Sequence, residues 1–143
     1  MKILVSACLL GIACRYDGSA VTNDAVLRLN QTHTLIPFCP EVHGGLATPR
    51  EPAEISGVRV CTRSGVDVTD NYEKGAAETL RLMKLLHCDC AVLQDRSPSC
   101  GCGVIHDGSF TGALVEGDGL TARALKAEGY RVLPASRAEE LTE

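Results

Sequence analysis

Three of the eight cysteines in this 143-residue chain stand where an apolar segment gives way to a loop. Cys8 and Cys100 each follow such a segment, and Cys39 ends one. A cysteine thiolate can act as a nucleophile, as a redox group, or as a soft ligand for iron, zinc or copper. The chemistry depends on whether these three side chains meet.

The other five cysteines carry weaker signals. Cys61 lies inside a predicted hairpin strand, and Cys88 and Cys90 flank the start of an apolar strand. We expect these three to be small buried hydrophobic side chains, because free cysteine is among the most buried residue types. Cys14 and Cys102 lie near the candidate site, and each could be a spare ligand.

Strands and helices alternate along the sequence. Apolar strands are predicted at residues 2–7, 33–38, 90–94 and 130–134, and helices at residues 22–30, 70–87 and 117–129. The longest helix has an apolar stripe with spacings of three and four, formed by Tyr72, Ala76, Leu80, Met83 and His87.

Turn and cap residues mark the ends of these elements. A hairpin is predicted over residues 57–69, because Ser64-Gly65 separates two alternating runs. Thr22 or Asn23 is expected to cap the first helix, and Asp118 the last, which ends at Gly129.

This order of elements predicts the fold class. Short apolar strands separated by helices indicate a mostly parallel, twisted sheet with helices on both faces. We therefore expect one α/β domain over residues 1–143, of Rossmann-like or flavodoxin-like type. The loops that follow parallel strands emerge at one edge of the sheet, where ligands bind. Cys8, Cys39 and Cys100 should therefore share one crevice.

Composition narrows the range of partners. Apolar residues make up 45% of the chain, yet no run approaches the ~20 apolar residues of a membrane span. A net charge of −4 and an aromatic content of 3% disfavour binding to nucleic acid. The N-terminal MKILVSACLLGIAC is predicted to begin with a strand rather than a lipoprotein signal. We therefore expect a cytoplasmic protein with reduced cysteines and a small-molecule ligand.

Spacing alone leaves the identity of the bound group open. A structural zinc site commonly uses paired Cys-x₂₋₄-Cys motifs, and a disulfide oxidoreductase uses Cys-x-x-Cys; the sequence has neither. An iron–sulfur cluster tolerates ligands that are far apart in sequence. An iron–sulfur cluster, zinc, and redox-active or inert thiols all remain possible from the residues themselves.

A family resemblance goes further. The segments that carry it run from Val5 to Leu125 and are SACLLG, CRYDG, PFCPEVHGGLATPR, YEKGA, RSPSCG, DGSFTG and GDGLTA. They resemble the signature segments of the bacterial thiouracil desulfidases. The resemblance implies a [4Fe-4S] cluster held by three cysteines, with one iron not bound by protein. It also implies a small thiolated base as substrate, such as 2-thiouracil, which is desulfurated to uracil and hydrogen sulfide without net redox change.

The same resemblance assigns the ligands. Cys8 of SACLLG, Cys39 of PFCPE and Cys100 of RSPSCG match the cluster-binding positions. Pro98 stiffens the loop before Cys100, whereas Gly101 leaves the direction of Cys102 poorly specified. Because cluster ligands must be rigidly presented, we predict Cys102 to line or flank the pocket without binding the cluster.

Three further residues are candidates for catalysis. Glu41 lies two residues after Cys39, and a carboxylate near cluster thiolates should have a raised pKa that suits a general acid/base. We expect it to deprotonate a water that attacks the thiocarbonyl carbon. Ser97 and Ser99 flank Pro98 and could orient water, hold the base or donate hydrogen bonds to the cluster.

Other polar residues have ordinary interpretations. Arg50 and Arg96 are expected to be surface charges, although either could bind a carbonyl or phosphate group. His43 and His106 are expected to be solvated or turn residues. The segment GDGLT, residues 117–121, could close the floor of the pocket, because glycine lets backbone amides approach a ligand.

Two functions of other classes compete with the desulfidase. One is a structural or regulatory zinc-binding module without activity. The other is a thiol-based sulfur carrier in which Cys100 or Cys102 takes up a persulfide. The metal content of anaerobically purified protein would separate the first of these from a cluster enzyme.

Overall fold

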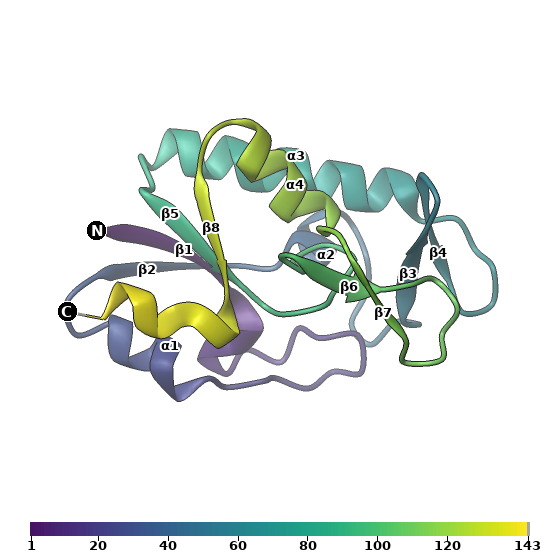
Figure 1. The fold of residues 1–143 in the computed structure, drawn as a ribbon, viewed down its shortest axis with the longest axis horizontal. Helices are drawn as coiled ribbons and strands as arrows, with labels where there is room; N and C mark the ends of the chain where they lie inside the picture. Colours follow the sequence, from purple (N-terminus) through teal and green to yellow (C-terminus); the bar gives the residue numbers. More distant parts are fainter. Residues whose placement is uncertain (143) are drawn as a thin grey trace.

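A four-stranded parallel sheet forms the centre of the molecule (Figure 1). The computed structural model describes residues 1–142. The strands, in their order across the sheet, are β2 (Thr34–Phe38), β1 (Lys2–Ser6), β5 (Cys90–Leu93) and β8 (Arg131–Pro134). All three pairings are parallel, which confirms the predicted sheet and its four strands.

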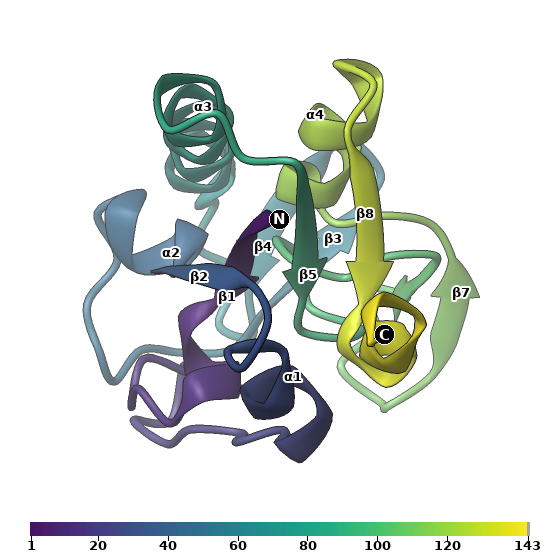
Figure 2. The same cartoon turned by 90° about the vertical axis from the view of Figure 1, so that its left-hand side faces the viewer.

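Helices cover both faces of this sheet (Figure 2). The first face packs against α1 (Asp24–Leu29) and two 3₁₀ segments, η1 (Ala7–Leu10) and η2 (Ala135–Leu141). The second face packs against α3 (Thr69–Leu85) and α4 (Leu120–Ala127). The α/β class with two helical layers is therefore confirmed.

The alternation of side chains along the strands explains the two layers. In β1, Ile3 and Val5 belong to the cluster on the α1 face, and Leu4 belongs to the cluster on the α3 face. In β5 all four residues are buried, because successive side chains point to opposite faces and both faces are covered.

Strand β2 differs from the prediction in its environment. Its apolar sequence is typical of a buried strand, but it lies at the edge of the sheet, and only Phe38 of its five residues is buried. Pro37 fits this position because an edge strand can lack one ladder donor. The apolar sequence of residues 33–38 therefore predicted the strand correctly, but it did not predict that the strand lies at the edge of the sheet.

Two antiparallel hairpins lie beyond one end of the sheet (Figure 1). They are β3 (Ala53–Ser56) with β4 (Arg59–Thr62), and β6 (Val104–His106) with β7 (Leu114–Glu116). The predicted hairpin over residues 57–69 is confirmed in part. Around Ser64-Gly65, Thr62 N donates to Val66 O and Val68 N donates to Val60 O, both at 2.8 Å, with an antiparallel bridge between Cys61 and Asp67. The regular partner of β4 is instead β3, which it meets across a turn at Gly57-Val58.

The helix ends show one confirmed cap and one correction. Asn23 caps α1, and its side chain accepts a hydrogen bond from Val26 N at 3.1 Å. The predicted cap Asp118 is wrong, because Gly119 occupies that position in α4. The carboxylate of Asp118 instead accepts from Gly103 N at 2.8 Å.

The apolar stripe of the longest helix is largely confirmed. Tyr72, Ala76 and Met83 are buried, whereas His87 lies beyond the end of α3 in a left-handed conformation. None of the helices in residues 1–142 combines the length and apolarity needed to cross a membrane.

Candidate functional site

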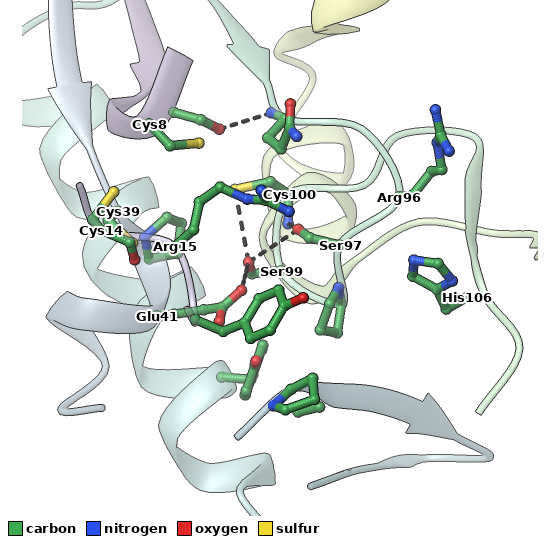
Figure 3. A pocket seen from close by; sticks show the side chains of 18 of the residues that line it. Cys8, Cys14, Arg15, Cys39, Glu41, Arg96, Ser97, Ser99, Cys100 and His106 are labelled. Carbon is green, nitrogen blue, oxygen red and sulfur yellow. Dashed lines mark hydrogen bonds between the residues drawn. The ribbon is translucent and has the colours of Figure 1, made fainter. Parts of the chain in front are cut away.

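A cavity of about 320 Å³ opens where the carboxyl ends of β1, β2 and β5 meet. Cys8, Cys39 and Cys100, which are far apart in sequence, all line it (Figure 3). The predicted convergence of these three cysteines is therefore observed. The short helix α2 (Pro40–His43) and the β3–β4 and β6–β7 hairpins contribute the remaining walls.

Each of the three cysteines is placed by the element that follows its strand. Cys8 lies in η1, directly after β1. Cys39 follows β2 and is the N-cap residue of α2. Cys100 follows β5 at the end of a loop that runs back towards the cavity. The site therefore depends on the parallel pairing of β2, β1 and β5.

The loop that carries Cys100 is held by its own serine and by α4. Cys100 N donates to Ser97 Oγ at 2.6 Å. At the start of α4, Leu120 N donates to Pro98 O at 2.8 Å, and Thr121 N donates to Ser99 O at 3.0 Å. These hydrogen bonds hold the backbone of the loop that carries the Cys100 thiol.

The segment 117–121 supports this loop from behind. A Cβ atom on Gly119 would lie 2.5 Å from the carbonyl carbon of Ser99, so only glycine allows this approach. None of these five residues lines the cavity. The expectation that this segment closes the pocket floor is therefore wrong.

The two cysteines of the CGCG segment have different surroundings. The Cys100 side chain is buried and lines the cavity, next to Ser99 Oγ at 3.7 Å from its sulfur. Cys102 does not line the cavity; its sulfur lies 3.5 Å from Val132 O on the α3 face of the sheet. The prediction that Cys102 lines or flanks the pocket is corrected in this respect.

Cys14 is a fourth thiol in the cavity (Figure 3). It is buried, and its backbone carbonyl lies 3.9 Å from the sulfur of Cys39. Its place in the sequence had left its role undecided, since the connection between η1 and α1 has no regular structure. The fold thus brings Cys14, but not Cys102, to the three predicted ligands.

Burial disfavours the charged form of three of the cavity thiols. Together with the proximity of the Cys39 sulfur, burial raises the pKa of Cys8 to about 11 and that of Cys14 to about 12. Burial is also the main reason that the pKa of Cys100 is raised to about 12. Since the thiolate is the form that binds metals, iron binding at this site must release protons.

The donor set fits an iron–sulfur cluster. Such clusters are held by cysteine thiolates, and four cysteines line this cavity. In the described part of the chain, no three His, Cys, Asp or Glu side chains are grouped closely enough for a single metal ion. A lone zinc ion would need each ligand sulfur about 2.3 Å from one point. A cluster is wider and accepts cysteine ligands from separate segments, such as those that line this cavity.

Glu41 lies beside the cysteines with both carboxylate oxygens engaged. Ser99 Oγ donates to Oε2 at 2.8 Å, and Arg50 Nε donates to Oε1 at 3.1 Å. The side chains of Glu41 and Arg50 are only 13% and 9% exposed, so the ion pair is largely withdrawn from water. Burial and the nearby charge of Glu41 raise the pKa of Tyr72, which keeps its hydroxyl protonated.

The remaining polar residues differ in their burial and in whether they line the cavity. Arg50 was expected to be a surface charge, and this expectation is wrong, because its side chain is largely buried in the ion pair with Glu41. Its position inside the segment PFCPEVHGGLATPR is the sequence feature that could have indicated a place in the site. Arg96 is exposed but lines the cavity on the side opposite Cys8 and Cys39, as does His106 (Figure 3). His43 is exposed, in agreement with its expected surface position.

Comparisons with known proteins agree with this site. The sequence profile of the 2-thiouracil desulfurase family matches residues 3–136. Uncharacterized protein YbbK of Bacillus subtilis (strain 168) is 42% identical over 149 aligned positions, which cover 97% of this chain and 99% of that protein. The solved structure of the [4Fe-4S]-dependent thiouracil desulfidase TudS is 42% identical, with a TM-score of 0.92, over 98% of this chain and 94% of that one.

These matches extend over nearly the whole chain, including every segment that lines the cavity. The resemblance read from the sequence segments is confirmed. This protein belongs to the 2-thiouracil desulfurase family.

Proposed function

We propose that this protein removes sulfur from 2-thiouracil and related thiolated pyrimidines by non-redox hydrolysis, giving uracil and hydrogen sulfide. Membership of the family supports the reaction, and the similarity to TudS supports a [4Fe-4S] cluster. The observation that carries the proposal is the convergence of Cys8, Cys39 and Cys100 beside the carboxylate of Glu41 in one cavity.

The cluster would be held by these three cysteines, with one iron not bound by protein. When bound, it would supply a soft Lewis acid suited to the sulfur of a thiocarbonyl group. Cys14 would remain a thiol at the edge of this ligand set.

Glu41 would act as the general base. Its carboxylate would take a proton from a water molecule, and the water oxygen would bond to the ring carbon of the C=S group. The carbon–sulfur bond would then break, and the sulfur would leave with its bonding electrons as hydrosulfide. Water supplies the oxygen and both protons of the products, so no electron donor is needed.

Two serines would assist through different contacts. Ser99 would hold Oε2 of Glu41 in place through its 2.8 Å hydrogen bond. Ser97 would act on the ligand loop, because its hydroxyl accepts the backbone N–H of Cys100. The hydroxyl oxygens of the two serines are also 3.3 Å apart, so one can donate a hydrogen bond to the other.

The test is a purification and assay without oxygen. We expect a brown protein that contains iron and acid-labile sulfide and converts 2-thiouracil into uracil and sulfide in equal amounts, without a reductant. A colourless zinc-containing protein with no activity would support the zinc-binding module instead. A persulfide on Cys100 or Cys102, formed without release of uracil, would support the sulfur carrier.

We further propose that the chain acts as a single domain, residues 1–143, in the cytoplasm. A reducing compartment would keep the cysteines available for iron. The substrate would be a small thiolated base, without a nucleic acid or a membrane as partner. The net charge of −4 supports this, because a polyanion would be repelled.

A further inference from the structure

Arg50 forms the only ion pair among residues 1–142 in which both side chains are largely buried. Its side chain is 9% exposed, and the side chain of Glu41 is 13% exposed. In every other ion pair of these residues, at least one side chain is 39% exposed or more. This pair therefore differs in kind from the surface pairs, which contribute little to stability.

The Arg50 side chain is anchored at several points besides the carboxylate. Nη1 donates to Ala47 O at 3.1 Å and to Thr48 Oγ1 at 3.0 Å. Nη2 donates to Cys14 O at 2.9 Å, and the backbone N–H donates to Tyr16 O at 2.7 Å. Nearly all the N–H groups of the guanidinium thus donate to acceptors within the protein, so the guanidinium plane has little freedom to rotate.

These anchors join two walls of the cavity. One is the segment that contains Cys14, and the other is α2, which carries Glu41 just after Cys39. Withdrawing both charges from water costs free energy, which the pair recovers only through good geometry and additional hydrogen bonds. Stability alone is therefore a weak reason for an ion pair at this place.

Both oxygens of Glu41 are bound from different directions. Arg50 holds Oε1 and Ser99 holds Oε2, so the plane of the carboxylate is fixed with respect to the cysteines. A general base must lie within hydrogen-bond reach of the proton that it takes, and a displacement of about 1 Å can cost 10²-fold in rate.

We propose that Arg50 is a positioning residue for the reaction, which fixes the orientation of the Glu41 carboxylate at the cysteine site. This inference rests on the proposed function of Glu41 as the base. Arg50 acts through Glu41 and takes no proton itself. Its removal should therefore lower kcat with little change in KM.

The experiment is a double-mutant cycle on the cluster-loaded enzyme, with kcat expressed per bound cluster. Arg50→Gln in the parent should lower kcat by roughly 10- to 100-fold, the range seen when outer contacts of a site are removed. In a Glu41→Gln background the same substitution should lower kcat by less than about 3-fold, because the group that Arg50 orients is already gone. Arg50→Lys keeps the cation and should retain more activity than Arg50→Gln.

Arg59→Gln is the matched control. It removes an ion pair with Asp67 of nearly the same length, 3.0 Å, but with side chains that are 70% and 42% exposed. It should leave kcat unchanged. The iron content and visible spectrum of each variant report separately on whether the cluster site is intact.

The outcomes separate this inference from the proposed function. If the parent enzyme forms no uracil, the proposed function fails. If the parent is active and Arg50→Gln matches it, or lowers kcat equally with and without Glu41, the positioning role of Arg50 is overturned. Should Arg50→Gln fail to fold, the same cycle is run with Arg50→Lys. Its smaller loss of kcat should likewise disappear in the Glu41→Gln background, and a loss that is equal in both backgrounds would overturn the positioning role.

Discussion

At the scale of single residues, the proposed chemistry depends on a few atoms around Glu41. Its two oxygens bind Ser99 and Arg50, and the sulfur of Cys100 lies 3.7 Å from the same serine hydroxyl. Few other groups in the cavity could take the place of this carboxylate as the proposed base. Asp95 also lines the cavity and would be the next candidate.

Glu41→Gln should therefore retain the cluster but lose most desulfuration. The amide has the same shape and can still accept from Arg50, yet it cannot take a proton at neutral pH. General acid/base groups contribute roughly 10²–10⁴-fold, and we expect a loss of kcat in this range. Uracil formation per bound cluster measures it.

A matched substitution, Glu73→Gln on the exposed face of α3, should have no effect. A fully active Glu41→Gln enzyme would show that the base is another group. Asp95→Asn would then be the next variant to test.

The two cysteines of the CGCG segment give a second residue-scale prediction. Cys100→Ser should abolish both cluster and activity, because Cys100 lines the cavity and hydroxyl is a poor ligand for iron in such clusters. Cys102→Ser should bind iron nearly as well as the parent, since its side chain contacts Val132 instead. Iron and sulfide contents of the two purified variants measure this.

The reverse result would contradict the assignment. If iron content falls in Cys102→Ser and survives in Cys100→Ser, Cys102 is the ligand and the loop rearranges when the cluster binds. Each variant serves as the control for the other.

At the scale of elements, the contact between α2 and α3 holds one wall of the site. A Cβ atom on Gly75 in α3 would lie 2.1 Å from Pro40 O, and one on Gly44 would lie 2.1 Å from Asn71 O. Neither neighbour is a flexible side-chain end, so the two helices must separate if either glycine is replaced. Because Pro40 lies between Cys39 and Glu41, the contact also positions the proposed ligand and the proposed base.

Gly75→Ala should destabilise the protein although alanine is the better helix former. The intrinsic preference would favour alanine by about 1 kcal/mol. Overpacking against Pro40 should outweigh this gain and lower the free energy of unfolding by roughly 1–3 kcal/mol. Urea unfolding followed by circular dichroism measures the net sign.

The control is Ala77→Gly at an exposed position of the same helix, which should cost about the propensity difference alone, ~1 kcal/mol. An increase in stability for Gly75→Ala would mean that α2 can move away from α3 at little cost.

At the scale of the whole molecule, the cavity is lined by segments that are far apart in sequence and that the sheet brings near each other. Its thiols come from η1, from the connection between η1 and α1, from the start of α2 and from the loop after β5. The two main hydrophobic clusters lie on the two faces of the sheet and are formed largely by other residues. The fold is therefore expected to persist without the cluster. It should lose only the stabilisation that a bound cluster would provide by connecting these segments.

Removal of the cluster should lower Tm while unfolding remains cooperative. A group that binds the folded state and not the unfolded chain stabilises the former by mass action, and its loss reverses this effect. Anaerobic thermal unfolding of the loaded and iron-depleted protein, followed by circular dichroism, measures the shift.

Cys8→Ser provides the control, because it should show the lower Tm whether or not iron and sulfide are added. Unfolded depleted protein at 25 °C would contradict the prediction and would make the cluster a condition of folding.

The sequence by itself determined the elements and the likeness to a family. The strands at Lys2–Ser6 and Cys90–Leu93 and the helix at Thr69–Leu85 were predicted because hydrophobic periodicity is a local property of the chain. The position of Cys8, Cys39 and Cys100 after strands predicted their convergence, because parallel strands share one carboxyl edge.

Only the tertiary structure decided which loop side chains enter the site. Cys14 and Cys102 looked alike in sequence, but α4 packs behind the CGCG loop so that Cys102 faces Val132 while Cys14 faces the cavity. Arg50 looked like a surface charge until the fold placed it between Glu41 and the Cys14 carbonyl. Periodicity does not encode such contacts, since they join segments far apart in sequence and depend on how complete elements pack against each other.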